Sequence, residues 1–196
     1  MTADTSPTSK ATYPRSDNVD VLFLLEGTFP FVAGGVSSWV NQIIRGFPEI
    51  RFGAIFLGSR AQDYGDLRYA LPDNLVHLEV TYLFEDRESP PVMQVKLPAD
   101  TLAMVERMHS LFETDFKHPD CPHLLASLMD EAGPDGKLTH DMFLYSKAAW
   151  DMIKKTYRRR STDPSFVDYF WTIRTIHTPF WRLRAVAVKA PKARIY

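Results

Sequence analysis

Residues 19–58 read VDVLFLLEGTFPFVAGGVSSWVNQIIRGFPEIRFGAIFLG, and two apolar runs in this stretch enclose a loop and a helical pattern. Residues 19–25 form a short, nearly continuous apolar run, which is typical of a strand buried on both faces of a parallel sheet. Residues 52–58 form a second run of this kind. A strand, a loop, a helix and a strand in this order indicate a crossover unit with parallel strands.

The helix between these strands is indicated by apolar residues at offsets 0, 3, 4, 7, 8 and 11. They are Val36, Trp39, Val40, Ile43, Ile44 and Phe47. This spacing places them on one face of a helix. Gly46 and Pro48 are expected to end the helix.

A third strand is predicted at residues 75–84, where apolar and polar side chains alternate. Because His77 and Glu79 fall on the polar side of this alternation, we expect a half-exposed strand near the edge of the sheet. A strand order of 3-2-1 would match a doubly wound sheet. The expected fold class is therefore α/β, with a Rossmann-like parallel sheet.

Helical patterns dominate from about residue 98 onward. One helix is predicted to begin at Pro98 and another after an Asp163-Pro164 cap. Further helices are predicted around residues 124–129, at 143–157 and at 180–188. Residues 194–196 resemble the start of a strand. We therefore expect a flexible amino-terminal arm at residues 1–18 and one domain at residues 19–196, with a helical insertion at about residues 98–177.

The composition excludes several classes of protein. The 196 residues carry 23 Lys and Arg against 24 Asp and Glu, so a bulk-basic nucleic-acid binder is excluded. One cysteine excludes an intrachain disulfide framework, and no apolar run reaches the ~18 residues of a membrane span. Residues 1–18 lack the apolar core of a secretory signal, so we expect a soluble protein of a reducing compartment.

The loop between the first strand and the first helix carries the candidate site. Ligands of open α/β sheets bind at the carboxyl ends of the strands, and Gly34-Gly35 at a helix start would let a phosphate approach backbone N–H groups. A tight turn without a ligand is the alternative for a bare Gly-Gly pair. The loop fits neither the G-x-G-x-x-G fingerprint nor a Walker A motif, which argues against NAD or ATP.

The same segment, LEGTFPFVAGGVSSWV at residues 25–40, resembles the opening of the PelF-type glycosyltransferases. These enzymes belong to the retaining glycosyltransferase family 4 and have the GT-B fold. Further similar blocks are Gly58-Ser59-Arg60, Asp63-Tyr64-Gly65, Leu71-Pro72-Asp73-Asn74, Ser146, Ala149-Trp150 and residues 165–172. The resemblance implies that the chain is the incomplete amino-terminal half of a GT-B fold.

The resemblance also implies a function. Such enzymes transfer a sugar, with retention, from a nucleotide-diphosphate donor, expected to be a UDP-sugar, to a growing exopolysaccharide. The nucleotide-sugar is a substrate, and neither a metal nor another cofactor is expected. The family is cytoplasmic and works with an inner-membrane polysaccharide export complex, so peripheral association with that membrane is expected through partners.

The resemblance assigns site residues in one place only, the cleft-facing loop near the donor phosphates. They are Glu26, Gly27, Thr28, Gly34, Gly35, Val36 and Ser37. No catalytic residue is assigned, because the family's second domain, with most donor contacts, and the later strands of the first domain have no counterpart in this sequence. We therefore expect the isolated chain to be inactive.

The alternative function is a non-catalytic remnant or binding module that docks to an inner-membrane export complex. A basic run at residues 154–160 and the aromatic-rich residues 166–171 motivate it, although a solvated helix face is the favoured interpretation of the basic run and a packed core is the simplest interpretation of Phe166, Tyr169 and Phe170. His118, Asp120, Cys121 and His123 resemble a metal-ligand group, but a surface loop is the better interpretation because two prolines interrupt them.

Overall fold

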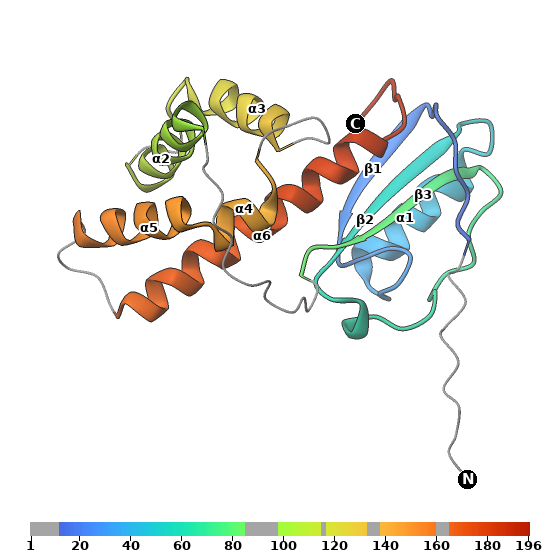
Figure 1. The fold of residues 1–196 in the computed structure, drawn as a ribbon. Helices are drawn as coiled ribbons and strands as arrows, with labels where there is room; N and C mark the ends of the chain where they lie inside the picture. The colour runs from blue at the N-terminus through green and yellow to red at the C-terminus, as the bar shows by residue number, and fades with distance from the viewer. Residues whose placement is uncertain (1–11, 85–97, 115–116, 133–137, 160–164) are drawn as a thin grey trace, which may run out of the picture. The chain divides into compact units, whose positions relative to one another are not determined.

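The computed structural model describes residues 12–84, 98–114, 117–132, 138–159 and 165–196. The chain divides into two compact units, one of residues 1–82 with 190–196 and one of residues 83–189. We call the first the sheet unit and the second the helical unit (Figure 1). Helices continue to Lys189, beyond residue 177, where the insertion was expected to end.

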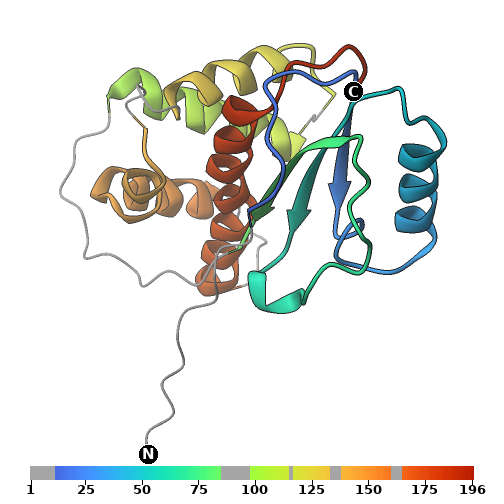
Figure 2. The same ribbon diagram turned by 90° about the vertical axis from the view of Figure 1, so that its right-hand side faces the viewer.

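The sheet unit contains three parallel strands in the order β1-β2-β3, namely β1 (Val21–Glu26), β2 (Phe52–Gly58) and β3 (Leu75–Tyr82). This order confirms the predicted 3-2-1 arrangement and the Rossmann-like α/β fold class. Helix α1 (Gly35–Gly46) connects β1 to β2 and lies on one face of the sheet (Figure 2). The short 3-10 turn η1 (Ala61–Asp63) follows β2.

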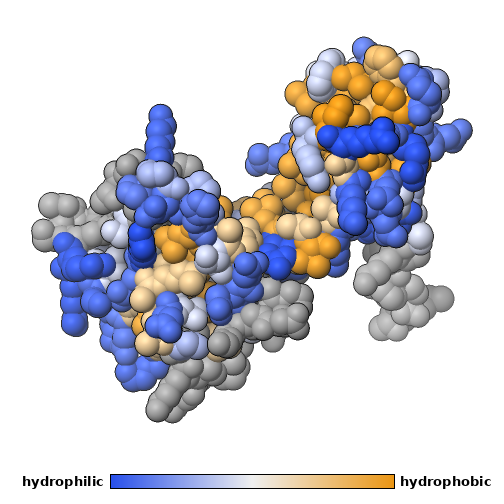
Figure 3. Space-filling view, turned by 90° about the horizontal axis from the view of Figure 1, so that it is seen from above, coloured by the Kyte–Doolittle hydropathy of each residue, from blue (hydrophilic) through white to orange (hydrophobic). Residues whose placement is uncertain are grey.

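Only part of the apolar face of α1 is buried. Val40, Ile44 and Ser37 are its buried residues, whereas Val36 and Trp39 are 56% and 58% exposed. Val40 and Ile44 lie one turn apart and join the core of the sheet unit, so the other flank of the apolar stripe points away from that core. On the face shown in Figure 3, hydrophobic residues of the sheet unit reach the surface and are bordered by hydrophilic ones.

Strand β3 differs from the prediction of a half-exposed strand, because its polar residues are buried. His77 and Glu79 are 3% and 7% exposed. The carbonyl oxygen of Ser16 lies 2.8 Å from Nδ1 of His77, and Arg15 forms an ion pair with Glu79. Burial lowers the pKa of His77, and the hydrogen bond to Ser16 partly opposes this shift. Contacts with residues distant in sequence therefore override the alternating pattern.

Residues 12–18, which belong to the arm expected to be flexible, pack against the sheet unit. The N–H of Leu78 donates to the carbonyl oxygen of Pro14 at 2.9 Å. The Tyr13 ring meets the Phe31 ring edge-on, with a centroid distance of 6.2 Å. Residues 1–11 of the arm lie outside the described residues.

The last residues of the chain run parallel to β1 on the side opposite β2. Isolated parallel bridges join Asn18 to Lys192 and Val21 to Ile195. The N–H of Leu22 donates to the carbonyl oxygen of Ile195 at 2.9 Å. The strand start predicted at residues 194–196 is therefore present as bridges beside β1 rather than as a regular strand.

The helical unit contains α2 (Ala99–Thr114), α3 (Cys121–Glu131), α4 (His140–Tyr145), α5 (Lys147–Arg159) and α6 (Phe166–Lys189). Its core includes residues from all five helices. The start of α6 is capped by the Ser165 hydroxyl oxygen, which accepts from the N–H of Asp168 at 3.3 Å. The cap pair predicted at residues 163–164 lies outside the described residues. No helix in the described ranges is long and apolar enough to cross a membrane.

The single helix predicted at residues 143–157 is divided between α4 and α5 at Ser146. The backbone of Ser146 is extended, with φ −79° and ψ 152°, and its hydroxyl oxygen accepts from the N–H of Ala149 at 3.1 Å. Thr139 caps α4 in the same way, with its hydroxyl oxygen 3.1 Å from the N–H of Met142. Each helix therefore begins at its own side-chain cap.

Helix α6 is continuous, although a separate helix was predicted at residues 180–188. It contains Pro179, which removes one backbone hydrogen bond from the helix. Packing on both sides of the proline explains the continuity. Ile173 belongs to the core of the helical unit, and the indole N–H of Trp181 donates to the carbonyl oxygen of Leu138 at 3.1 Å.

Candidate functional site

The candidate site begins at the carboxyl end of β1. Glu26 is the last residue of the strand and is exposed. Gly27 follows with φ +58°, a left-handed conformation that side chains disfavour, and its N–H donates to the carbonyl oxygen of Leu57 at 3.0 Å. The turn that leaves β1 therefore requires glycine at position 27 for its own geometry.

Two phenylalanines fix the loop that follows to the core of the sheet unit. Phe29 is fully buried and Phe31 is 5% exposed. The Phe31 ring lies 4.7 Å from the ring of Phe56 in β2. The N–H of Phe31 donates to the carbonyl oxygen of Thr28 at 3.1 Å, which closes a turn. The loop therefore has a fixed path from the end of β1 to the start of α1.

Thr28 contributes an unusual polar group to this loop. Its hydroxyl oxygen is buried and has no hydrogen-bond partner among the described residues. An unsatisfied buried hydroxyl costs about 1–3 kcal/mol, and such groups in native structures call for an explanation. Among the residues predicted for the site, Thr28 is the one with an unmet hydrogen-bonding requirement within the described chain.

The start of α1 is open. Gly34 is extended, with φ 170° and ψ 177°, and within the described residues it provides no side-chain cap for the helix. The first turn of α1 carries no acidic residue, so nothing in the sequence there offsets the positive end of the helix dipole. A Cβ atom built on Gly34 or Gly35 would meet no heavy atom within 4 Å. Glycine at these two positions is therefore not required by packing.

The last two residues predicted for the site lie differently. Ser37 is 1% exposed and belongs to the buried side of α1, whereas Val36 is exposed. Because they are adjacent in a helix, their side chains point in directions about 100° apart. Of these two residues, only Val36 presents its side chain to solvent.

Three residues after β2 also belong to this edge of the sheet, although sequence reasoning did not assign them to the site. Tyr64 accepts a hydrogen bond from the N–H of Ser59 at 3.2 Å, and its hydroxyl oxygen lies 3.4 Å from a Cβ built on Gly27. Asp63 accepts hydrogen bonds from the Ser59 hydroxyl at 2.5 Å and from the N–H of Arg60 at 3.2 Å. The turn after β2 therefore meets the turn after β1.

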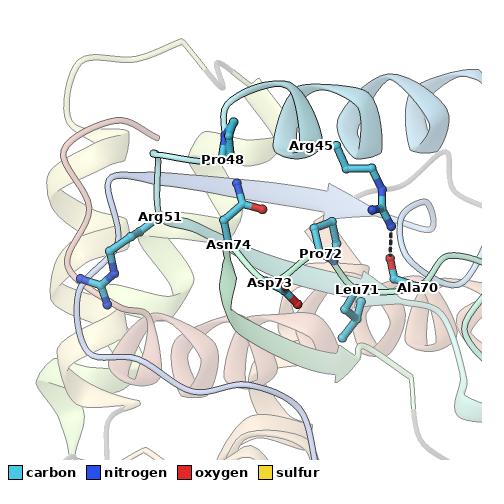
Figure 4. Close-up of a pocket in the computed structure, with 8 residues that line it drawn as sticks. All are labelled: Arg45, Pro48, Arg51, Ala70, Leu71, Pro72, Asp73 and Asn74. Atoms are coloured by element: carbon cyan, nitrogen blue, oxygen red, sulfur yellow. Dashed lines mark hydrogen bonds between the residues drawn. The ribbon is translucent and has the colours of Figure 1, made fainter.

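A surface pocket of about 620 Å³ lies at the opposite end of the sheet unit, where α1 ends (Figure 4). It is lined by Arg45, Pro48, Arg51, Ala70, Leu71, Pro72, Asp73 and Asn74. The guanidinium of Arg45 donates to the carbonyl oxygen of Ala70 at 3.0 Å. Because this pocket lies before β2 and β3 rather than at their carboxyl ends, the fold does not favour it as the ligand site.

Asn74 in this pocket closes the end of α1. Its amide nitrogen lies 2.7, 3.0 and 3.2 Å from the carbonyl oxygens of Ile44, Phe47 and Ile50. Replacing Asn74 with alanine leaves these carbonyls without their donor, so we expect a loss of about 1–3 kcal/mol in the free energy of unfolding. Urea unfolding of the chain measures this loss. The exposed neighbour Asp73, replaced by alanine, is the control and should change stability by less than about 0.5 kcal/mol.

Asp120 and His118, two of the four residues in the metal-ligand group suggested by the sequence, form other interactions. Asp120 forms an ion pair with Arg107 at 2.5 Å, and Nδ1 of His118 accepts from the N–H of Asp120 at 3.2 Å. Cys121 is the first residue of α3. Across the described ranges, no three His, Cys, Asp or Glu side chains are grouped to hold a metal ion.

The basic run at the end of α5 is partly paired within the helical unit. Lys154 lies 2.9 Å from Asp151, and Lys155 lies 3.2 Å from Glu106. Hydrogen bonds from Lys147 and Lys154 lower the pKa of Asp151 to about 2. Arg160 lies outside the described residues. Two of the basic side chains therefore stabilise the helical surface itself, as expected for a solvated face.

The aromatic residues at the start of α6 divide into a packed and an exposed group. Phe166, Tyr169 and Phe170 pack in the core of the helical unit, as the spacing predicted. Trp171 is 52% exposed, and the guanidinium of Arg174 lies 5.0 Å from its ring centroid. Trp171 and Arg174 therefore form a surface cation–π pair rather than a core contact.

Comparison with known proteins places the chain in a family without assigning an activity. No curated protein and no solved structure matches it. A family model described as a domain of unknown function, DUF3492, matches residues 19–196, which include the described helices and strands of both units. The match begins just before β1 and includes the whole candidate loop. The chain therefore belongs to the DUF3492 family.

Proposed function

We propose that this chain forms the acceptor-side half of the active site of a retaining, PelF-type glycosyltransferase. In this proposal the loop after β1 lies against the diphosphate of a nucleotide-sugar donor, a UDP-sugar. The observation that carries the proposal is the pair Gly34-Gly35, which packing does not require and which leaves the start of α1 open. The sequence resemblance at residues 25–40 supplies the reaction class.

The chemistry of the open helix start suits a departing nucleoside diphosphate. The first N–H groups of a helix have no partner within it, and the helix dipole places about half a positive charge there. A phosphate that approaches without meeting a Cβ atom can accept hydrogen bonds from these groups. Fixed donors aimed at the charge that develops on a leaving group stabilise the transition state, and no metal is needed for this effect.

The proposed reaction requires a second α/β domain, in the same polypeptide or a separate one, that supplies most donor contacts. The acceptor in the proposal is a growing exopolysaccharide. The described site contains no group that we assign as catalytic, so we expect the 196-residue chain alone not to transfer sugar. In the cell, the complete enzyme would work beside an inner-membrane polysaccharide export complex.

The test is sugar transfer from a UDP-sugar by a protein that joins this chain to the donor-binding domain. We expect Gly35→Ala to lower transfer at least about tenfold, which corresponds to a loss of about 1.4 kcal/mol, because the added methyl group holds the phosphate away from the helix. The same change should raise the stability of α1 by up to about 1 kcal/mol. Loss of activity with a gain in stability would identify a ligand role.

The matched control is Gly46→Ala at the other end of the same helix, where a Cβ also meets nothing within 4 Å. We expect this variant to transfer sugar at the wild-type rate. Equal transfer by the Gly35 variant and the wild type would contradict the role of the glycine pair. Absence of transfer from every UDP-sugar by the joined protein would contradict the proposed function.

A second candidate is a non-catalytic module that docks to the export complex. The exposed Trp171–Arg174 pair on α6 favours it, because exposed tryptophan and arginine are enriched in protein interfaces. Co-purification with inner-membrane export proteins should be lost in Trp171→Ala and kept in Thr172→Ala, an exposed neighbour on α6. Equal retention of the two variants would contradict docking through this pair.

A further inference from the structure

Tyr64 occupies a central place at the carboxyl edge of the sheet. Its ring stands edge-on to Phe56 at 5.1 Å and stacks on Tyr82 at 5.9 Å, so it contacts aromatic residues of β2 and β3. Its hydroxyl oxygen accepts from the N–H of Ser59, directly after β2. The ring therefore packs against side chains of the sheet, while the hydroxyl group forms its hydrogen bond in the turn after β2.

Gly58, the last residue of β2, and Gly27, which follows β1, both lie close to Tyr64. A Cβ built on Gly58 would lie 2.7 Å from the Tyr64 ring and 2.8 Å from the Phe56 and Tyr82 rings, which leaves no room for a side chain. A Cβ built on Gly27 would lie 3.4 Å from the Tyr64 hydroxyl oxygen. The Tyr64 hydroxyl therefore lies beside the turn after β1, where a side chain at position 27 would project.

The hydrogen bonds of the second turn fix the position of the Tyr64 hydroxyl. The Ser59 hydroxyl lies 2.5 Å from the Asp63 carboxylate and 3.4 Å from the Tyr64 hydroxyl oxygen. A serine hydroxyl can donate one hydrogen bond, and Ser59 donates it to the Asp63 carboxylate, which lies closer than the Tyr64 hydroxyl. The Tyr64 hydroxyl accepts from the Ser59 N–H and keeps its own proton to donate.

We propose that Tyr64 is a positioning residue of the candidate site. Its hydroxyl group holds the turn at Ser59 beside the turn at Gly27, and the position of Gly27 sets the path of the loop that leads to Gly34 and Gly35. The inference rests on the proposed function only for the identity of the ligand, a uridine diphosphate. The ring packs in the core and the hydroxyl does not, so the two contributions can be separated by substitution.

The test uses Tyr64→Phe, which keeps the ring and removes the hydroxyl. In the ligand-free chain, we expect the amide NMR signals of Gly27 and Ser59 to shift and the Ser59 amide to exchange about fivefold faster, as the loss of one hydrogen bond implies. UDP titration, followed at the amides of Gly34 and Gly35, should show at least about fivefold weaker binding. The thermal midpoint should fall by only a few degrees, because one hydrogen bond is lost and the aromatic contacts remain.

The matched control is Tyr82→Phe, since Tyr82 stacks on the same ring at 5.9 Å between centroids and loses a hydroxyl in the same way. We expect this variant to bind UDP as the wild type does. Unchanged Gly27 signals in Tyr64→Phe would overturn the inference, as would weaker binding accompanied by a fall in the thermal midpoint of more than about 8 °C, which the loss of one hydrogen bond does not explain. If the wild-type chain did not bind UDP, the proposed function would fail, and the Gly27 signals of the ligand-free variant would still decide the role of Tyr64.

Discussion

Replacing Phe56 with alanine should lower the free energy of unfolding by about 3–5 kcal/mol. Phe56 is fully buried in the central strand β2. Its ring lies within 4.7 Å of Phe31, 5.1 Å of Tyr64 and 6.4 Å of Tyr82, measured between centroids. Because one of these rings belongs to the candidate loop and another to the turn after β2, the cavity would also loosen the edge that carries the site.

Urea unfolding of the chain, followed by a signal from the aromatic core of the sheet unit, measures this effect. Leu24→Ala is the control, because Leu24 lies in the neighbouring strand β1 and is 63% exposed. We expect the control to change stability by less than about 0.5 kcal/mol. A loss below about 1 kcal/mol for Phe56→Ala would contradict the position of Phe56 at the centre of this core.

Acidification should destabilise the helical unit through His177. This residue is 3% exposed, its Nδ1 donates to the carbonyl oxygen of Ile173 at 2.7 Å, and its ring lies 4.8 Å from Phe143. Burial lowers the pKa of His177 from 6.5 to about 4, and the hydrogen bond to Ile173 opposes this shift only in part. His177 is therefore neutral in the folded protein near neutral pH.

The direction of the pH effect follows from the lowered pKa. As the pH falls below about 6.5, the unfolded chain binds a proton at His177 before the folded chain does, so unfolding becomes more favourable. The stability that His177 contributes is complete above about pH 6.5 and is lost progressively toward pH 4, by about 3 kcal/mol in total.

The measurement is the free energy of unfolding as a function of pH for the wild type, His177→Gln and His123→Gln. Because glutamine does not titrate, His177→Gln should make the pH dependence between pH 6.5 and 4 less steep, and the contribution of His77, whose pKa is also lowered, should remain. His123 is exposed on α3, so its replacement should leave the dependence as it is in the wild type. An equally steep loss of stability in His177→Gln and the wild type would contradict a buried neutral histidine.

Local sequence patterns predicted the elements of the sheet unit well, because each rests on neighbouring residues. The apolar runs became β1 and β2, and the helix between them ends at Gly46 as predicted. Burial was harder to predict. The apolar Trp39 is exposed because it lies on the flank of α1, and the polar Glu79 is buried by an ion pair with Arg15, a residue distant in sequence.

In the helical unit too, local sequence patterns did not predict features that depend on contacts distant in sequence. The helix expected at residues 143–157 contains a capping serine in its middle, and a cap is recognised only once the extended backbone of Ser146 is known. Pro179 would end a helix in isolation, but packing holds α6 together across it. Tertiary contacts, which single-sequence periodicity does not contain, determined both outcomes.

For the candidate site, sequence reasoning identified the loop after β1 but not the turn after β2. The signal was present, because Ser59 and Tyr64 follow a predicted strand, and carboxyl ends of parallel strands meet at one edge. The proximity of Tyr64 to Gly27 depends on the side-by-side pairing of β1 and β2, with Glu26 opposite Leu57. Only the structure supplies that register.

The most direct measurement of the central proposal is a titration of the 196-residue chain with UDP, followed by the amide NMR signals of the whole backbone. We expect the largest shifts at Gly34, Gly35 and Val36, at the open start of α1, at millimolar UDP. Shifts confined to the pocket around Arg45 and Asn74, or no shift in the glycine loop at any concentration, would contradict a phosphate-binding role for this loop.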